Sequence, residues 1–420
     1  MEKEKVIIVH LNKNDNERVV SSKIDELKEL VRSCNGEVIA EVIQNSKEIN
    51  PSTYIGSGKV KEIKELAENM EADTIIFNNE LTGSQMKNLE DIIDKKIVDR
   101  TGLILDIFAI RAKTKEGKLQ VKLAQLEYRL PRLVGYRNYL SREGAGIGTR
   151  GPGEQKLEID RRTVQREIDS IRIKLKEENK KRSVKRSKRF DSPIPVISLI
   201  GYSNAGKSTI LNRLVNLYSN QDKKVYSDDL LFATLDVSAR KITLDNGYDV
   251  IISDTVGFVS NLPTKLVESF KSTLEEIELS ELILIVIDSS NEDYEIQLNS
   301  TMEVLKDMDL KDKKFLYVFN KIDKNEKVYF DIKDSEKIYI SALDDDNIKI
   351  LAKKIEEIIF SDFVYLDVII PYSDISKINN VKASDKKDED EYLENGLKTK
   401  ILIKSSQKYK YEKYLVNYGI

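Results

Sequence analysis

The chain has 420 residues, of which 40% are hydrophobic and 34% charged, a balance typical of a globular protein with a heavily solvated surface. No apolar run reaches the ~20 residues that a membrane-spanning helix needs, and the charged start Met1–Lys5 is not expected to be a signal peptide. The single cysteine, Cys34, excludes an internal disulfide and a thiolate metal cluster. We therefore expect a cytoplasmic protein that acts as a monomer without a membrane span.

The net charge of −3 conceals a basic block between two acidic ones. Residues 1–110 carry a net charge of −6, residues 111–190 carry +14, residues 191–361 carry −11, and residues 362–420 are neutral. A basic block confined to one segment predicts contact with a polyanion. A solvated helical hairpin is the alternative that charge alone leaves open.

Residues 1–112 alternate between short apolar runs and amphipathic stretches, which predicts a small parallel sheet covered by helices. Ser21 or Ser22 is expected to cap the first helix. Gly56–Lys59 lacks the Gly-x4-Gly spacing of a phosphate loop, so we interpret it as a loop before a helix, with nucleotide binding as a minor alternative. The strands are expected near residues 6–9, 38–43, 74–77 and 97–98.

Residues 113–192 predict two helices joined by a glycine-rich tip. Leucines recur on one stripe over residues 115–133, and a second helix follows from about residue 155. Five glycines lie within residues 144–153 and cannot pack a core. Exposed backbone and arginine side chains suit approach to an RNA backbone, although a plain linker loop is the alternative. The residues expected at RNA are Arg142, Gly144, Gly146, Gly148, Arg150, Gly151 and Gly153.

A Gly-x4-Gly-Lys-Ser motif follows the apolar run Val196–Ile200 and precedes a helical pattern. This order of strand, glycine loop and helix is the context of a phosphate-binding P-loop. Lys207 is expected to reach the β- and γ-phosphates of a nucleoside triphosphate, and Ser208 to ligate Mg2+. The nucleotide-binding residues of the loop are Gly201, Tyr202, Ser203, Asn204, Ala205, Gly206, Lys207, Ser208 and Thr209.

Two further segments carry the signature of switch loops. Asp254, at the end of an apolar strand, is expected to hold Mg2+ through a water, and the Gly257 N–H to reach the γ-phosphate. Thr234 is the candidate switch threonine that closes onto Mg2+ and the γ-phosphate. We expect Lys207, Thr234 and Gly257 to act in catalysis. The nucleotide-contacting residues here are Phe232, Ala233, Thr234, Leu235, Asp236, Asp254, Thr255, Val256 and Gly257.

The identity of the base follows from the segment after the apolar strand 315–319. The Asp323 carboxylate can accept from guanine N1–H and N2–H2 together, whereas adenine would leave it unpaired. The backbone of Ser341–Leu343 is expected to meet guanine O6. The ligand is therefore GTP with Mg2+, and the residues of the base site are Asn320, Lys321, Ile322, Asp323, Ser341, Ala342 and Leu343.

Phe258 stands where small Ras-type GTPases place the glutamine that orients the attacking water. A phenyl ring offers no hydrogen bond to water, so we expect slow GTP hydrolysis unless a partner supplies the missing group. A core anchor for the second switch is an alternative reading of Phe258, and the two are compatible.

The last segment of the chain is expected to form a small separate domain. Residues 363–370 predict a strand, residues 373–381 a helical stretch, and residues 397–403 and 411–418 further strand or mixed structure. No motif there indicates a chemistry. The predicted division is an N-terminal α/β domain at 1–112, a basic helical hairpin at 113–192, a P-loop GTPase domain at 193–361 and a small α/β domain at 362–420.

On these motifs the chain resembles the HflX family of ribosome-associated GTPases. The resemblance includes four segments that generic GTPases lack, namely 53–59, 99–108, 117–124 and 150–154. It implies an α/β fold whose GTPase domain has a mostly parallel sheet with helices on both faces. It also implies binding to the 50S ribosomal subunit and the 70S ribosome in the GTP state, with the glycine loop near 23S rRNA, and a role in splitting or rescuing ribosomes under stress.

Other functions remain open at this point. A ribosome-assembly GTPase would prefer immature 50S subunits. An RNA-remodelling ATPase acting through the N-terminal domain would hydrolyse ATP even after Lys207→Ala, and the sequence offers no second P-loop for it. A switch that signals only to proteins would leave the +14 hairpin without a role.

Overall fold

The structure is a computed structural model of the chain that describes residues 3–135, 152–190, 194–219, 238–255, 257–258, 277–306, 308, 310, 313–324, 335–377 and 390–416. The chain forms two compact units, one holding residues 1–180 and the other most of residues 181–420. No helix in the described part of the chain combines the length and apolarity needed to cross a bilayer.

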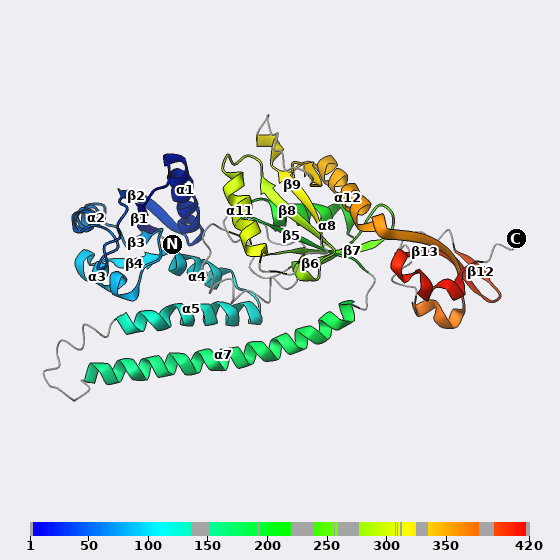
Figure 1. Cartoon of the computed structure of the whole chain (residues 1–420), viewed down its shortest axis with the longest axis horizontal. Coiled ribbons are helices and arrows are strands. Elements are labelled where there is room, and N and C mark those ends of the chain that lie inside the picture. The colour runs from blue at the N-terminus through cyan, green and yellow to red at the C-terminus, as the bar shows by residue number, and fades with distance from the viewer. Residues whose placement is uncertain are drawn as a thin grey trace. The chain divides into compact units, whose positions relative to one another are not determined.

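The first unit contains a four-stranded parallel sheet with the order β2-β1-β3-β4 (Figure 1). The parallel sheet predicted from the sequence is thus confirmed. β1 is buried over the whole of Val6–Leu11, the polar His10 included, because helices cover both faces of the sheet. The elements are β1 (Glu4–Asn12), α1 (Glu17–Ser33), β2 (Gly36–Asn45), α2 (Ser57–Asn69), β3 (Thr74–Phe77), α3 (Gly83–Ile93), β4 (Lys96–Asp99) and α4 (Arg100–Arg111).

Two helix starts differ from the sequence prediction. The cap expected at Ser21 or Ser22 is wrong, because the Asn16 side chain accepts a hydrogen bond from the Val19 N–H at 2.9 Å and starts α1 at Glu17. α4 was not predicted at all. It begins directly after β4, where the Asp99 side chain accepts from the Gly102 N–H at 2.8 Å.

The helices α5 (Lys115–Gly135) and α7 (Pro152–Phe190) form the predicted hairpin. Their apolar stripes pack together through Leu123, Leu126, Ile168 and Ile171, as the leucine spacing indicated. Ion pairs such as Arg172–Glu127 at 2.7 Å flank this seam. α7 begins at Pro152, three residues before the expected start, so Gly153 lies within the helix and not in the tip loop.

The second unit is built on a six-stranded sheet with the order β10-β9-β8-β5-β7-β6, parallel except for the pair β6–β7 (Figure 1). The mostly parallel sheet of a P-loop GTPase domain is therefore confirmed. The elements are β5 (Val196–Gly201), α8 (Lys207–Tyr218), β6 (Ser238–Thr243), β7 (Asp249–Asp254), β8 (Leu282–Asp288), α11 (Tyr294–Leu305), β9 (Lys314–Asn320), β10 (Lys337–Tyr339) and α12 (Asp345–Ile359).

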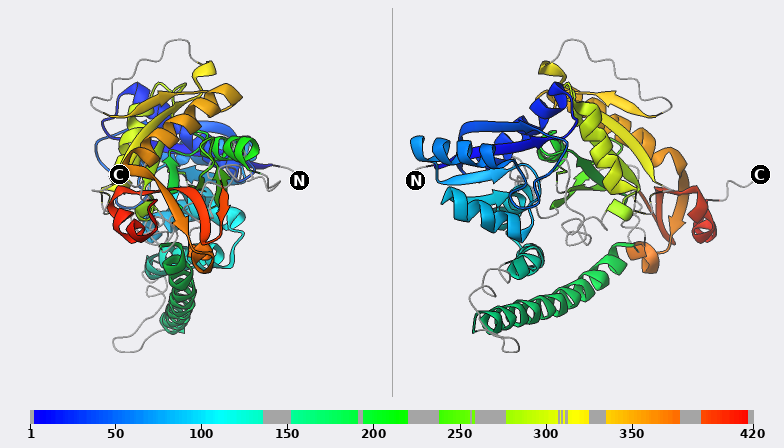
Figure 2. Two further views of the ribbon diagram at one scale, coloured as in Figure 1. Left: turned by 90° about the vertical axis from the view of Figure 1, so that its right-hand side faces the viewer. Right: turned by 60° about the vertical axis from the view of Figure 1, so that its left-hand side comes forward.

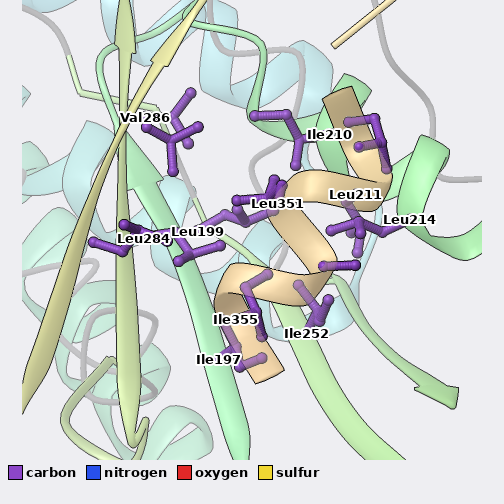
Figure 3. Packing of buried hydrophobic residues seen from close by; sticks show 14 of the residues in the cluster. Ile197, Leu199, Ile210, Leu211, Leu214, Ile252, Leu284, Val286, Leu351 and Ile355 are labelled. Carbon is purple, nitrogen blue, oxygen red and sulfur yellow. The ribbon is translucent and has the colours of Figure 1, made fainter. Parts of the chain in front are cut away.

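Alternate residues of the central strands face different helices. Leu284 and Val286 of β8 join the cluster formed with Leu211 of α8 and Leu351 and Ile355 of α12 (Figure 3). On the opposite face, Tyr294 of α11 lies against Phe319 of β9, with 6.5 Å between ring centroids. Helices therefore cover both faces, and the central strands are continuous apolar runs for that reason. Because these strands are parallel, their carboxyl ends lie at one edge of the sheet.

The C-terminal part is a three-stranded antiparallel sheet of β11 (Phe363–Ile370), β13 (Gly396–Lys404) and β12 (Glu391–Leu393), in that order. Short 3-10 helices lie against one of its faces (Figure 2). In the stretch 411–418, for which strand or mixed structure was expected, Glu412–Tyr414 is a 3-10 helix whose Tyr414 is buried in that face, and Leu415 forms an isolated bridge with Val368 of β11. The described part of the predicted helical stretch at 373–381 is the 3-10 helix Tyr372–Lys377.

Candidate nucleotide site

The carboxyl ends of four parallel strands place the predicted site residues along one edge of the six-stranded sheet. β5 ends at Gly201, β7 at Asp254, β9 at Asn320 and β10 at Tyr339, and β5 lies between β7 and β8. The strands that follow β5 in the chain lie first on its β7 side (β6 and β7) and then on its β8 side (β8, β9 and β10), so the strand order reverses at β5. A crevice at the carboxyl ends of such strands is where doubly wound α/β proteins bind ligands.

The P-loop backbone adopts the torsions that the glycines of its motif permit. Gly201 and Gly206 have φ of 144° and 99°, in the region that residues with a side chain rarely occupy. A Cβ on Gly206 would lie 2.1 Å from Asn320 Nδ2, and one on Gly201 would lie 2.2 Å from Val286 O. Both glycines are thus required by torsion and by space, and the loop can stay close to the neighbouring strands.

Lys207 is the first residue of α8, and only 6% of it is exposed. Its ammonium donates to the carbonyl oxygens of Gly201 at 3.0 Å and Tyr202 at 2.8 Å, which lie within the same loop. Burial, partly offset by the nearby Asp254 carboxylate and assisted by Lys321, lowers the pKa of Lys207 to about 8. The loop therefore encloses a cation that is mostly protonated at neutral pH and that loses its proton more readily than an exposed lysine.

The second residue of α8 meets the end of β7. Ser208 Oγ donates to Asp254 Oδ2 at 2.5 Å, and Asp254 is fully buried. A hydroxyl and a carboxylate oxygen are the hard ligands that Mg2+ takes when phosphates and waters complete its shell, so these residues fit that ion. The Thr255 hydroxyl, by contrast, donates to the Leu199 carbonyl oxygen of β5 at 2.8 Å and is therefore engaged with the sheet backbone.

The segment after β7 is tied to the P-loop by backbone hydrogen bonds. The Ser203 N–H donates to Phe258 O at 2.6 Å, and the Phe258 N–H donates to Gly201 O at 3.1 Å. A Cβ on Gly257 would come within 2.8 Å of Ser203 Cα. Only 3% of Phe258 is exposed, so its ring is a core anchor at this point, as the second reading of that residue anticipated.

Asn320 joins the base loop to the P-loop from its buried position at the end of β9. Its Nδ2 donates to Ala205 O at 2.9 Å, while its Oδ1 accepts from the Ala342 N–H at 2.9 Å. One amide side chain therefore holds the P-loop and the Ser341–Leu343 loop together. This structural role was not anticipated from the motif alone.

Asp288 is a site residue that the sequence analysis missed. Its carboxylate accepts from Lys321 Nζ at 2.7 Å, and the same ammonium donates to Asn204 O at 2.7 Å. Lys321 and Asn204 both have positive φ, at 66° and 61°. The available signal was an aspartate directly after the apolar run of β8, at the same edge as Asp254.

Asp323 and Leu343 lie at the outer part of the site. Asp323 belongs to a 3-10 turn, Ile322–Lys324, and is exposed. Ser341 is buried, and its N–H donates to Asn347 Oδ1 at 3.2 Å. The base loop is therefore fixed by its own hydrogen bonds, and the Asp323 carboxylate is accessible to a ligand.

The structure brings together the P-loop, Asp254, Thr255, Gly257 and the two base loops. Residues 232–236, which include Thr234, and Val256 lie outside the described residues. Arg142, Gly144, Gly146, Gly148, Arg150 and Gly151 of the hairpin tip also lie outside them.

Three protein families together match most of the chain. Residues 21–109 match the family described as GTP-binding GTPase N-terminal, residues 111–189 match GTP-binding GTPase Middle Region, and residues 196–321 match 50S ribosome-binding GTPase. The three ranges follow the chain from the N-terminal α/β part through the hairpin to the six-stranded sheet.

Curated relatives resemble the chain over most of its length. GTPase HflX of Caldanaerobacter subterraneus subsp. tengcongensis is 44% identical over 424 aligned residues, covering 99% of this chain and 95% of the relative. GTPase HflX of Escherichia coli K12 is 39% identical, covering 76% and 73%. A GTP-binding protein from Sulfolobus solfataricus in complex with GDP has a solved structure with 25% identity and a TM-score of 0.44, and the match covers 84% of this chain and 98% of that chain.

Proposed function

Because the chain belongs to the HflX family of GTPases and is a GTP hydrolase, we propose that it uses GTP to act on the ribosome. In this proposal it binds the 50S subunit and the 70S ribosome while GTP is bound, and splits, recycles or rescues ribosomes, notably under stress. The match of residues 196–321 to a 50S ribosome-binding GTPase family is the observation that carries it. The basic hairpin supports it independently.

The proposed nucleotide chemistry follows from the enclosed cation and the loop around it. Lys207 would exchange its carbonyl partners, Gly201 and Tyr202, for the β- and γ-phosphate oxygens of GTP. The N–H groups at the start of α8 and in the loop would bind the phosphates, aided by the positive end of the helix dipole. The Gly257 N–H and Thr234 would contact the γ-phosphate.

Ser208, Thr234 and, through a water, Asp254 would hold Mg2+, which neutralises charge on the β- and γ-phosphates. The Ser208–Asp254 contact supports this assignment, because it places the hydroxyl and carboxylate oxygens 2.5 Å apart at the start of α8. Phe258 contributes no hydrogen bond to an attacking water. The ribosome is therefore the proposed source of the group that completes catalysis.

Guanine specificity is proposed to rest on Asp323, whose exposed carboxylate can accept from two guanine donors. Lys321, held by Asp288 and Asn204, would lie beside the base. Ala342 and its neighbours would contact guanine O6 through backbone N–H groups. These contacts require the base loop to stay in place, which is the role that the Asn320 hydrogen bonds support.

The hairpin is proposed to contact 23S rRNA through its tip. Residues 111–190 carry 24 lysines and arginines against 10 acidic residues, which favours binding along an RNA backbone. Arg142 and Arg150 would donate to phosphates, and the glycines between them would let the backbone approach closely. We also propose the four-part division predicted from the sequence, a monomeric state and a cytoplasmic location.

Co-sedimentation with ribosomes tests the proposal. The full chain is centrifuged with purified 50S subunits and 70S ribosomes in GTP, GDP or a non-hydrolysable GTP analogue, each at low and high salt. We expect pelleting with the analogue, weaker pelleting with GDP and a marked decrease at high salt. Pelleting that is independent of nucleotide and salt would overturn the proposal.

Further measurements distinguish the proposed ribosomal function from the alternatives. Preferential binding to immature 50S particles would favour an assembly role, and light scattering of 70S ribosomes shows directly whether they dissociate when the protein and GTP are added. Lys207→Ala should lose every nucleotide-dependent effect. ATP hydrolysis that survives Lys207→Ala would favour an RNA-remodelling ATPase.

A further inference from the structure

The C-terminal part of the chain has a charge asymmetry that its neutral total conceals. The last 25 residues, 396–420, contain six lysines and one glutamate, whereas residues 362–395 contain nine acidic residues and four lysines. The basic half consists of β13 and the 3-10 helices that follow it. Lysines gathered on one short segment can form a surface for a polyanion.

The segment that follows β13 is anchored to the sheet by one set of its side chains. Tyr414 is buried against the apolar face formed by β11 and β13, and its hydroxyl donates to Asp374 Oδ2 at 2.5 Å. Tyr411 and Leu415 pack on the same face. The Val416 N–H donates to Asp367 O at 3.0 Å. The backbone from 405 to 416 is therefore held in one place on the sheet.

The other side chains of this segment point into solvent. Lys408, Lys410 and Lys413 are exposed, and 67% of Tyr409 is exposed, compared with 9% of Tyr414. The Lys410 ammonium lies 6.0 Å from the centre of the Tyr409 ring, and that of Lys413 lies 4.5 Å from the Tyr414 ring. Within the described residues, no ion pair involves any of these three lysines.

An exposed aromatic ring between lysines has a specific chemical use. Lysine ammonium groups bind phosphate oxygens, and a tyrosine ring offers a flat face on which an unpaired base can stack. A tyrosine that supported the fold would be buried like Tyr414. An acidic peptide would use the lysines but leave the ring without a role, and a duplex presents no free base faces.

We propose that Lys408, Tyr409, Lys410 and Lys413 form a binding surface for unpaired RNA. The three lysines contact successive phosphates, and Tyr409 stacks on one base. This surface is separate from the hairpin and from the nucleotide site, and it does not depend on the ribosomal role proposed above. It gives the C-terminal sheet a function as the platform that holds the lysines and the ring in a fixed arrangement.

Fluorescence anisotropy with the full chain and a labelled oligouridylate of about 12 nucleotides tests the proposal. Tyr409→Ala should weaken binding by about fivefold or more without changing its salt dependence, because it removes stacking and no charge. Tyr409→Phe should retain the affinity. The variant with Lys408, Lys410 and Lys413 all changed to Ala should lower the slope of log affinity against log salt by about 2, at about 0.7 for each lost phosphate contact.

A matched control removes exposed lysines elsewhere in the same unit. Lys306→Ala and Lys353→Ala together should leave affinity and slope unchanged, and unchanged melting temperatures would show that all variants are folded. Because the hairpin is also basic, photocrosslinking with a thiouridine oligonucleotide locates the contact. We expect an adduct on the peptide that contains Tyr409.

Two results would overturn the proposal. One is unchanged RNA affinity in both the Tyr409→Ala and the triple-lysine variants, with every crosslink in residues 111–190. The other is loss of binding in the triple-lysine variant, equal affinity for polyglutamate and RNA, and no effect of Tyr409→Ala, which would indicate an acidic protein partner. Since no ribosome is present, either result is distinct from failure of the proposed ribosomal function.

Discussion

Ser203 in the P-loop and Phe258 after β7 are joined by a hydrogen bond of 2.6 Å from the Ser203 N–H to the Phe258 carbonyl. The phenyl ring of Phe258 is buried at the same place. The residue therefore ties the segment containing Gly257 to the loop around Lys207, and its side chain cannot orient a water. Its position explains how a residue that lacks a catalytic group can still be important for the geometry of the site.

Gly206→Ala should weaken nucleotide binding. The new Cβ would lie 2.1 Å from Asn320 Nδ2 at a backbone φ of 99°, so the P-loop or the base loop must move. We expect GDP affinity to fall by at least about tenfold, together with a lower melting temperature. Titration with a fluorescent GDP analogue measures this. Gly58→Ala is the control, because nothing lies within 4 Å of a Cβ at Gly58, and unchanged GDP affinity in Gly206→Ala would contradict the argument.

Nucleotide affinity should decrease as the pH rises above about 8. Burial lowers the pKa of Lys207 to about 8 in the free protein, and bound phosphates would raise it, so binding takes up a proton above that pH. We expect little change from pH 6.5 to 7.5 and a loss approaching tenfold per unit above the free pKa.

Calorimetric titration with GDP in buffers of different ionisation enthalpy measures this proton uptake directly. Whatever affinity Lys207→Arg retains should be nearly independent of pH up to 9, because arginine stays protonated. Equal pH dependence in wild type and Lys207→Arg would assign the effect to another group.

Asp323→Asn should change the preferred base from guanine to xanthine. The carboxylate accepts from two guanine donors, whereas an asparagine amide can donate to the carbonyl oxygen that xanthine carries at position 2. We expect GTP affinity to fall by at least about a hundredfold and XTP to bind better than GTP. Competition between the two nucleotides measures the change. Retention of the guanine preference would show that Asp323 does not contact the base.

Arg132→Ala should destabilise the first unit. Arg132 donates to Asp99 Oδ2 at 2.9 Å and to Leu81 O at 2.9 Å, and Asp99 is fully buried. Removal of the arginine leaves the buried Asp99 carboxylate without its cationic partner, which should lower the free energy of unfolding by about 3 kcal/mol. Chemical denaturation followed by circular dichroism measures the loss. Arg129→Ala, at an exposed position on the same helix, should cost far less, and equal losses would refute the role of the ion pair.

Much of the fold could be predicted because apolar runs mark its parallel strands. Strands such as β8 are buried on both faces and appear in the sequence as uninterrupted hydrophobic segments. Helix starts were less predictable. Asn16 caps α1 from a polar stretch that also resembles a loop. α4 begins at Arg100, directly after the last residue of β4, Asp99, so a strand and a helix share one continuous segment.

The sequence predicted the residues of each nucleotide-binding motif, because each motif is a short continuous segment. The P-loop and the base loops lie at the strand ends where the spacing placed them, but contacts between motifs could not be derived from spacing. Asn320 bridges Ala205 and Ala342, and Asp288 holds Lys321, through residues that are far apart in the sequence. The exposed Tyr409 likewise differs from the buried Tyr414 only through the packing of the C-terminal sheet.

The most direct test of the account is the rate of GTP hydrolysis under single-turnover conditions, with and without purified 50S subunits. The account predicts slow hydrolysis by the protein alone, because Phe258 offers no hydrogen bond to water, and at least about a tenfold increase when 50S subunits are added. Lys207→Ala is the control for contaminating GTPases and should show no hydrolysis in either condition. Fast hydrolysis by the protein alone, with no further increase on addition of 50S subunits, would contradict the account.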